Sequence, residues 1–249
     1  MPPGMRAFRA AVLTATVLGM GPLAARQPLA HPDFSGVWTE YLAPGEHFAL
    51  PALDMGLPFT AEGRAKVDAY VALVGGESDN PGAHCLGSGM PESMTFSGVY
   101  PMEILQRPEY ITVIYEAHTE VRHWYFAAKV IPPGDRIPSR NGYSTAHWEG
   151  STLVVETTAL KEQEDQMFPH SAEARLLERY HLTSDAKGTR ILVADWTLTD
   201  PSFYTRPIVG RKSWALDPHG ILLPYECNEE AWLDHLEDLK RGKAKAGYR

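Results

Sequence analysis

Over residues 100–216, apolar and polar residues alternate with a period of two in short runs that end at turn residues. This pattern is typical of half-buried β-strands. Paired runs flank short connections at 117–120, 149–151 and 184–188, and each pair predicts a hairpin. A last run at 204–216 brings the set to about seven antiparallel strands. Many short strands with few helices predict a closed barrel or a sandwich.

Helical spacing is found only outside this region. Thr60 is a good N-cap, and the apolar residues that follow it fall at helical spacing as far as Gly75-Gly76. Residues 227–242 predict an amphipathic C-terminal helix. Residues 77–99 predict a long irregular loop, and a loop of this length is usually functional or held in place. A strand is also expected at 31–41, behind a proline turn.

Strand alternation decides which side chains can share an interior. In 191–198, one face is wholly apolar and the other carries Asp195 and Thr197 among Ile and Val. Two arrangements are consistent with this pattern. Either the apolar face is core and the mixed face meets solvent, or the mixed face lines a pocket, as in a barrel wide enough for a ligand.

The two ends of the chain differ from its middle. Arg6 and Arg9 precede an uncharged, mostly apolar segment at 10–25, which predicts a cleaved signal peptide over residues 1–30 and a single domain at 31–249. The segment is too short to cross a bilayer comfortably, so no stable membrane span is expected after cleavage. The alternative is an uncleaved membrane anchor. The sequence thus predicts a periplasmic or secreted protein.

Charge and cysteine content narrow the classes further. Without Arg6 and Arg9 the formal charge changes from −8 to −8 − 2 = −10, which gives no electrostatic basis for binding nucleic acid. Cys85 and Cys227 are the two cysteines, and an even count in an oxidising compartment favours a disulfide between them. Two separate buried thiols are the alternative.

Motifs for nucleotide cofactors, zinc proteases and serine hydrolases are absent, and the ten histidines show no zinc-ligand spacing. We therefore expect no cofactor and no metal; a metal held by three ligands that are distant in the sequence is the alternative. Acid–base chemistry needs a histidine or carboxylate whose pKa is moved by its surroundings. For each candidate an ordinary structural role is the alternative. The catalytic candidates are His147, His170, Glu116 and Glu178. The candidates for substrate binding are Tyr143, Arg122, His123, Trp124, Trp148 and Tyr204.

Five stretches, in this order, carry a resemblance to known proteins: HPDFSGVW, YPMEILQRPEYITVIYE, NGYSTAHWEGSTLVVET, LLERYHL and TDPSFYTRP. They resemble a large family of exported, mostly uncharacterised bacterial proteins. The resemblance covers roughly residues 31–226. It implies a lipocalin-like β-barrel and says little about a reaction.

The chain departs from the pattern of this family at several positions. Tyr143 stands where the family usually has histidine, His147 where it has arginine or a similar residue, and Ser151 where it has aspartate. In the Cys-x-Pro-x-Gly-x-Pro pattern, Gly87 replaces the first proline. These departures indicate a specialised member, in which Tyr143 and His147 are the best candidates for its own function.

Together, these observations predict a mainly β protein, a single antiparallel lipocalin-like β-barrel with one N-terminal-side helix and one C-terminal helix. The first hypothesis for its function is an exported, cofactor-independent acid–base enzyme, a lyase, dehydratase or isomerase. Its substrate would be a hydrophobic aromatic or phenolic small molecule, such as a lignin-type aromatic dimer. The alternatives are a non-catalytic carrier or sensor of the cell envelope and a structural envelope protein. A homo-oligomer is compatible with each.

In this scheme His147 or His170 removes a proton, and Glu116 or Glu178 orients that base or returns the proton. Tyr143 or Arg122 steadies a phenolate-like charge on the substrate.

Overall fold

The computed structural model describes residues 31–45, 56–74 and 81–227, together with Leu233, Glu237 and Arg241. The predicted signal peptide lies outside this part of the chain. So does most of the predicted C-terminal helix, of which Cys227, Leu233 and Glu237 are described and helical.

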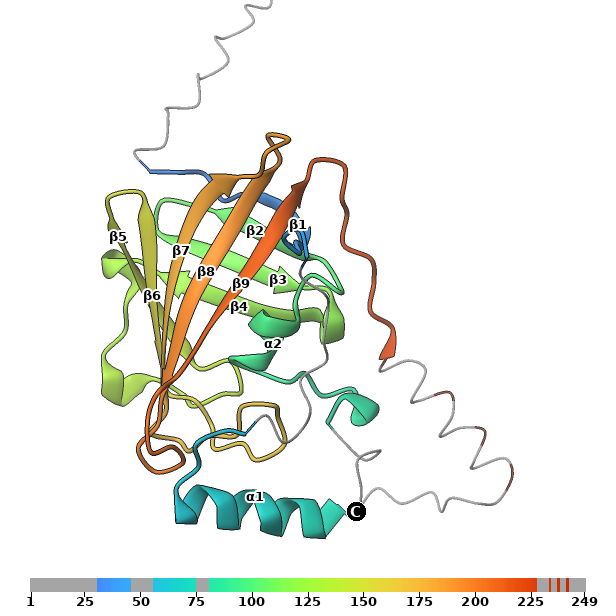
Figure 1. The fold of residues 1–249 in the computed structure, drawn as a ribbon, viewed down its shortest axis with the longest axis vertical. Helices are drawn as coiled ribbons and strands as arrows, with labels where there is room; N and C mark the ends of the chain where they lie inside the picture. The colour runs from blue at the N-terminus through green and yellow to red at the C-terminus, as the bar shows by residue number, and fades with distance from the viewer. Residues whose placement is uncertain are drawn as a thin grey trace, which may run out of the picture. The chain divides into compact units, whose positions relative to one another are not determined.

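Nine strands form a closed barrel in which each strand pairs with its neighbours in sequence and β9 pairs with β1 (Figure 1). The predicted mainly β barrel is confirmed. The strands are β1 (Gly36–Glu40), β2 (Met102–Gln106), β3 (Tyr110–Tyr115), β4 (Glu120–Tyr125), β5 (Tyr143–Glu149), β6 (Thr152–Thr158), β7 (Arg175–Ser184), β8 (Arg190–Thr199) and β9 (Ile208–Asp217).

One junction between strands differs from the others. β4 and β5 are parallel, and they pair only at Trp124↔Ser144 and Tyr125↔Thr145. All other neighbouring strands are antiparallel, with three or more paired residues. We call this junction the seam. A wholly antiparallel barrel was expected, and the seam differs because the long connection from β4 to β5 returns the chain in the same direction.

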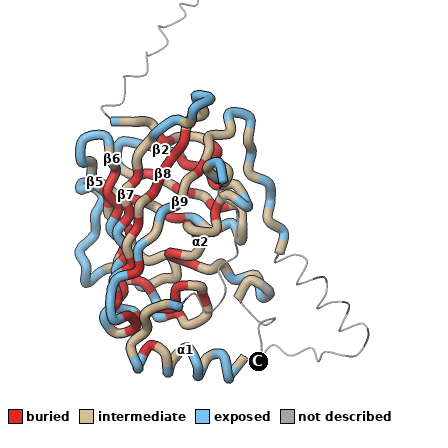
Figure 2. Tube along the Cα trace, in the orientation of Figure 1, coloured by how far each residue is buried: buried red, intermediate tan, exposed pale blue. Residues whose placement is uncertain are grey.

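The helix α1 (Ala61–Val74) begins as predicted, because the amide of Gly63 donates to the Thr60 hydroxyl at 3.0 Å. Its apolar positions are less buried than helical spacing suggests: Val71 is 55% exposed, and Gly63 alone is classed as buried. The same contrast is visible in Figure 2, where buried positions follow the barrel strands and few lie in α1.

The sequence predicts an irregular loop over residues 77–99, but the described residues of this stretch, 81–99, are not irregular throughout. They contain a helix, α2 (Glu92–Phe96), which begins after Pro91. Five residues are too few for helical periodicity to reveal. Single 3₁₀ turns are η1 (Pro81–His84), η2 (Ala117–Thr119), η3 (Ala127–Lys129) and η4 (Pro133–Asp135).

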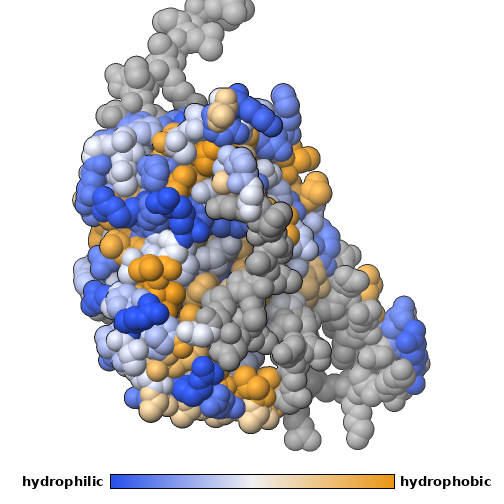
Figure 3. Space-filling model, in the orientation of Figure 1, coloured by the Kyte–Doolittle hydropathy of each residue, from blue (hydrophilic) through white to orange (hydrophobic). Residues whose placement is uncertain are grey.

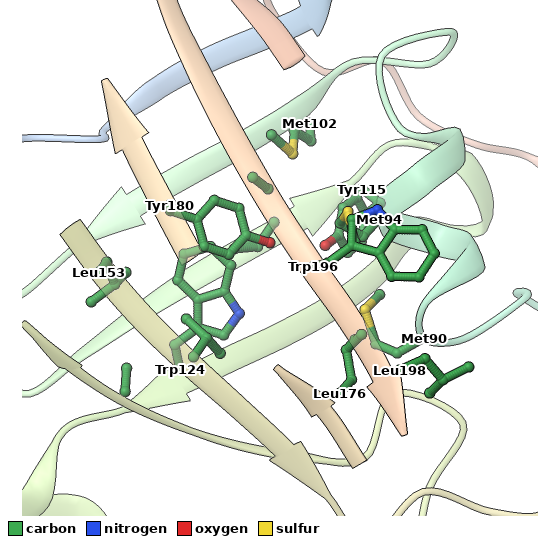
Figure 4. Packing of buried hydrophobic residues seen from close by; sticks show 14 of the residues in the cluster. Met90, Met94, Met102, Tyr115, Trp124, Leu153, Leu176, Tyr180, Trp196 and Leu198 are labelled. Carbon is green, nitrogen blue, oxygen red and sulfur yellow. The ribbon is translucent and has the colours of Figure 1, made fainter. Parts of the chain in front are cut away.

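The apolar face of β8 belongs to the core, which settles the choice that alternation left open. Leu192, Ala194 and Leu198 are fully buried there, and Trp196 is nearly so. Large side chains fill the barrel interior, with Tyr180 packed on Trp124 at 4.6 Å between ring centroids (Figure 4). The other fully buried large side chains are Trp38, Trp214, Phe34, Phe203, Met90, Met94, Met102, Ile104, Ile111 and Leu153.

One ion pair lies within this core. Arg122 of β4 donates to both carboxylate oxygens of Glu178 on β7, and both side chains are almost fully buried. Arg122 also donates to Ser144 of β5 at 3.0 Å and to Thr157 of β6 at 2.5 Å. Burial alone would lower the pKa of Arg122, but the charge and hydrogen bonds of Glu178 outweigh this effect, and the pKa lies above its usual value.

The outer face of β7–β9 carries a shallow groove of about 440 Å³. Exposed Leu177 and Val209 lie in it beside the ion pair between Arg211 and Asp195. Figure 3 shows hydrophilic and hydrophobic patches side by side on the face of the molecule that it presents. Within the described ranges, no helix has the length and apolar character needed to cross a membrane.

The buried pair predicts a large difference between two substitutions. Glu178→Ala leaves Arg122 charged and unpaired in the core, so we expect the free energy of unfolding to fall by about 3–5 kcal/mol. Glu156→Ala is the matched control, because Glu156 is half exposed and pairs with Arg175 at 3.5 Å; about 0–1 kcal/mol is expected. Urea denaturation measures both. Similar values for the two variants would contradict this account of the pair.

Candidate functional site

A cleft in the barrel wall opens along the seam. It has a volume of about 530 Å³, and we call it the seam cleft. It exists because β4 and β5 pair over only two positions, so the start of β4 and the segment before β5 lie apart. Three segments line it, at 85–87, at 118–125 except Trp124, and at 139–144.

Aromatic side chains form one wall of the seam cleft. The rings of Tyr125 and Tyr143 are stacked, with centroids 5.1 Å apart and 16° between their planes. His123 lies 5.7 Å from Tyr125, and its Nδ1 pairs with the hydroxyl of Thr112 at 3.1 Å. Burial lowers the pKa of His123, so its imidazole is neutral at neutral pH. This wall can hold a planar ring beside a neutral imidazole.

A second part of the lining is polar and centred on Glu120. The carboxylate accepts hydrogen bonds from the amide of Gly89 at 3.2 Å, from Asn141 at 3.2 Å and from the hydroxyl of Ser93. Gly87 is essential to this arrangement, because a Cβ there would lie 2.3 Å from the Glu120 carboxyl carbon. The carboxylate is therefore held in one orientation by three donors from two segments, 89–93 and the segment of Asn141.

A second space lies beside the seam cleft, under α2. This α2 pocket has a volume of about 170 Å³. His118 and Glu120 line both spaces and so separate them. The other lining residues are Ser88, Glu92, Ser93, Phe96, Ser97, Val99, Tyr100, Tyr115 and Ala117.

His118 combines backbone strain with an unsatisfied ring nitrogen. Its φ is 56° and that of Thr119 is 51°, so two successive non-glycine residues are left-handed. Each such residue costs roughly 1–2 kcal/mol. The buried Nδ1 has no hydrogen-bond partner among the described residues. An unpaired buried nitrogen costs about 1–3 kcal/mol more. Strain concentrated in this way is typical of functional sites.

A segment near the C-terminus holds His118 from outside. Tyr225 packs on its ring with 4.8 Å between centroids. Two contacts keep this segment in place: the amide of Leu223 donates to Glu116 at 2.7 Å, and Cys227 forms a disulfide with Cys85, which lines the seam cleft. The predicted disulfide is thus present, and it closes part of the site.

Three of the six predicted binding residues meet at the seam cleft. Tyr143 and His123 contribute their rings, whereas the Arg122 guanidinium is directed inward to Glu178. The other three lie elsewhere. Trp124 is buried in the core, and Trp148 stacks on His31 at 4.6 Å. Tyr204 is buried and donates its hydroxyl to the carbonyl of Pro169.

None of the four predicted catalytic residues lines either space. His147 is on the outer face of β5, its side chain 65% exposed, 3.3 Å from Glu149. His170 is fully buried and donates Nδ1–H to the carbonyl of Phe168 at 3.0 Å. Glu178 is in the core ion pair, and Glu116 holds the amide of Leu223.

Sequence reasoning missed His118, Glu120 and Asn141 as site residues. His118 and Glu120 belong to a short connection between two strands, where polar residues are ordinary. A weak signal is present, since His-Thr-Glu places two groups able to transfer protons within three residues. Asn141 is far from both residues in the sequence, and it lies near them only because β4 and β5 pair at the seam.

Comparisons with known proteins identify no relative: no family model, curated protein or solved structure matches the chain. Within the described ranges, no group of three or more histidine, cysteine or acidic side chains is arranged to hold a metal ion. The site therefore has to be interpreted from its own geometry.

The burial of His170 predicts a pH dependence. Burial lowers the pKa of His170 in the folded state below its unfolded value of about 6.5. The unfolded chain therefore binds a proton first as the pH falls, and the free energy of unfolding falls below pH 6.5 by up to about 1.4 kcal/mol per pH unit. His170→Gln should remove this part of the slope. Urea denaturation between pH 5 and 8 measures it; an unchanged slope in His170→Gln would refute the assignment.

The disulfide predicts a local and a global effect. Replacing Cys85 and Cys227 by alanine removes a cross-link between residues 142 apart in sequence, and we expect the free energy of unfolding to fall by about 2–5 kcal/mol. Hydrogen exchange at 218–227 should speed up, because the contacts of Leu223 and Tyr225 no longer have this anchor. Wild-type protein treated with a reductant should behave like the variant. Unaltered exchange in 218–227 would show that the segment is held independently of the disulfide.

Proposed function

We propose that the protein is an exported acid–base enzyme that acts on a small aromatic or phenolic molecule in the seam cleft, without a cofactor. The reaction class is proton transfer, as in a lyase, dehydratase or isomerase. The observation that carries this proposal is His118, a strained histidine with a buried unpaired nitrogen at the boundary of two spaces.

The chemistry follows from the groups present. His118 takes a proton from the substrate and becomes an imidazolium, then returns the proton to another atom of the substrate or to the leaving fragment. Glu120 accepts a hydrogen bond from a substrate hydroxyl, because its orientation is already fixed by three donors. No electrons are transferred, so no redox partner is needed.

The substrate class is supported by the aromatic wall. Stacked Tyr125 and Tyr143 offer aromatic surface to a ligand ring, and the guanidinium of Arg136 lies 4.7 Å from the centroid of the Tyr143 ring and helps to fix it. A two-ring compound such as a lignin-type aromatic dimer has a size that suits a cleft of about 530 Å³ with a smaller adjoining pocket.

The proposal also includes that the protein is exported and that it belongs to the family that its sequence resembles. A disulfide is stable in an oxidising compartment, which supports the periplasm or the exterior. Two of the departures from the family pattern, Gly87 and Tyr143, line the seam cleft. Gly87 leaves the room that Glu120 occupies, which supports a site specialised in this protein.

Replacement of His118 tests the proposal. Asparagine tolerates the left-handed backbone of residue 118, so His118→Asn removes the imidazole with little effect on the turn. We expect turnover of a panel of hydroxylated aromatics and aromatic dimers, without cofactor, to fall about 100-fold or more. His181→Asn, on β7, is the control, because His181 lines neither space, and this variant should retain wild-type turnover.

Two other outcomes would change the assignment. Loss of turnover in His147→Asn, with turnover retained in His118→Asn, would favour His147 as the catalytic base, as the sequence alone suggested. Thermal stabilisation by panel compounds without any product would favour the alternative function, a carrier or sensor that uses the same aromatic wall.

A further inference from the structure

The α2 pocket has the size of a single ring. A cavity of about 150 Å³ in another protein accepts one benzene molecule, and the α2 pocket has about 170 Å³. Its walls include Phe96, Val99, Tyr100 and Tyr115. Val99 and Tyr100 are about half exposed, so they form an apolar entrance on the surface.

Two residues that line this pocket carry a buried polar atom without a hydrogen-bond partner: the hydroxyl of Tyr115 and Nδ1 of His118. The Ser88 hydroxyl donates to Glu92 at 2.9 Å, and the Ser93 hydroxyl donates to Glu120, so both hydroxyl protons are already used. Nδ1 of His118 is buried and has no partner. A ligand that donates a hydrogen bond to this nitrogen would satisfy it.

Charge restricts the ligand further. Glu120 and Glu92 both line the pocket, and the described residues lining it include no lysine or arginine. Burial raises the pKa of the Glu92 carboxyl, while hydrogen bonds from the Met167 amide and from Ser88 offset part of that effect. An anionic ligand would meet two acidic groups and no lining cation, and the nearby guanidinium of Arg140 is already paired with Asp165. A neutral ligand is therefore favoured over a carboxylate.

We propose that the α2 pocket binds one neutral hydroxylated ring of phenol size, with the ring hydroxyl donated to Nδ1 of His118. The inference rests on the proposed function and adds where each part of the substrate binds. One ring lies under α2 and the remainder lies in the seam cleft against Tyr125 and Tyr143. The strained turn at His118 then places the base at the junction of the two parts.

Equilibrium binding of phenol to the full-length mature protein tests this without any turnover. Toluene, benzoate and 2-naphthol are the comparison ligands, and calorimetry or ligand-observed NMR measures each. Phenol should bind more tightly than toluene, while benzoate and the two-ring naphthol should bind far more weakly. Val99→Trp narrows the entrance and should weaken phenol binding about tenfold or more. Val130→Trp, at an exposed valine that lines neither space, should leave it unchanged.

The role of His118 has its own readout. His118→Asn should weaken phenol binding about three- to tenfold, the value of one hydrogen bond, and leave toluene binding unchanged. Equal phenol affinity in Val99→Trp and wild type, or benzoate affinity equal to that of phenol, would overturn the inference. If phenol binding is as described but no panel compound is turned over, the proposed enzyme fails and the ring site stands.

Discussion

Closure of the barrel depends on Arg122. The seam joins β4 and β5 by only two residue pairs, too few for a strand junction to be stable by backbone hydrogen bonds alone. Arg122 compensates from inside the barrel, since its guanidinium binds Ser144 of β5, Thr157 of β6 and Glu178 of β7. One side chain of β4 is thus linked to the next three strands. The pair with Glu178 is almost fully buried, so the loss of Glu178 would leave a buried, unpaired charge on Arg122.

The same weak junction that requires Arg122 also creates the cleft. Where the pairing of β4 and β5 stops, the wall opens, and segments 85–87 and 139–144 come to face the start of β4. The barrel interior is filled by aromatic and methionine side chains, so the proposed ligand site lies in the wall and not in the lumen. Rigid strands on both sides hold Tyr125 and Tyr143, and the disulfide to Cys227 keeps Tyr225 against His118. The short pairing of β4 and β5 therefore explains both the need for Arg122 and the presence of the cleft.

Much of the fold could be predicted from the sequence, because strands, hairpin turns and the Thr60 cap are set by local patterns. The turn at Gly150, with a φ of 61°, is one such case. The inward face of β8 could not be chosen, since alternation alone does not say which side is enclosed. The site was harder still. His147 and Tyr143 lie on the same outer face of β5, yet only Tyr143 reaches the cleft, because the cleft ends where the seam pairing begins. Glu178 carries a plausible catalytic group and instead completes the core.

The central claim is that a ligand is held at the junction of the seam cleft and the α2 pocket, beside His118. A crystal structure of the protein with a phenolic two-ring compound tests this most directly. The account predicts density for one ring under α2, with its hydroxyl within hydrogen-bond distance of Nδ1 of His118, and for the second ring against Tyr125 and Tyr143. Density in the groove on the outer face of β7–β9, with both spaces beside His118 free of ligand, would contradict it.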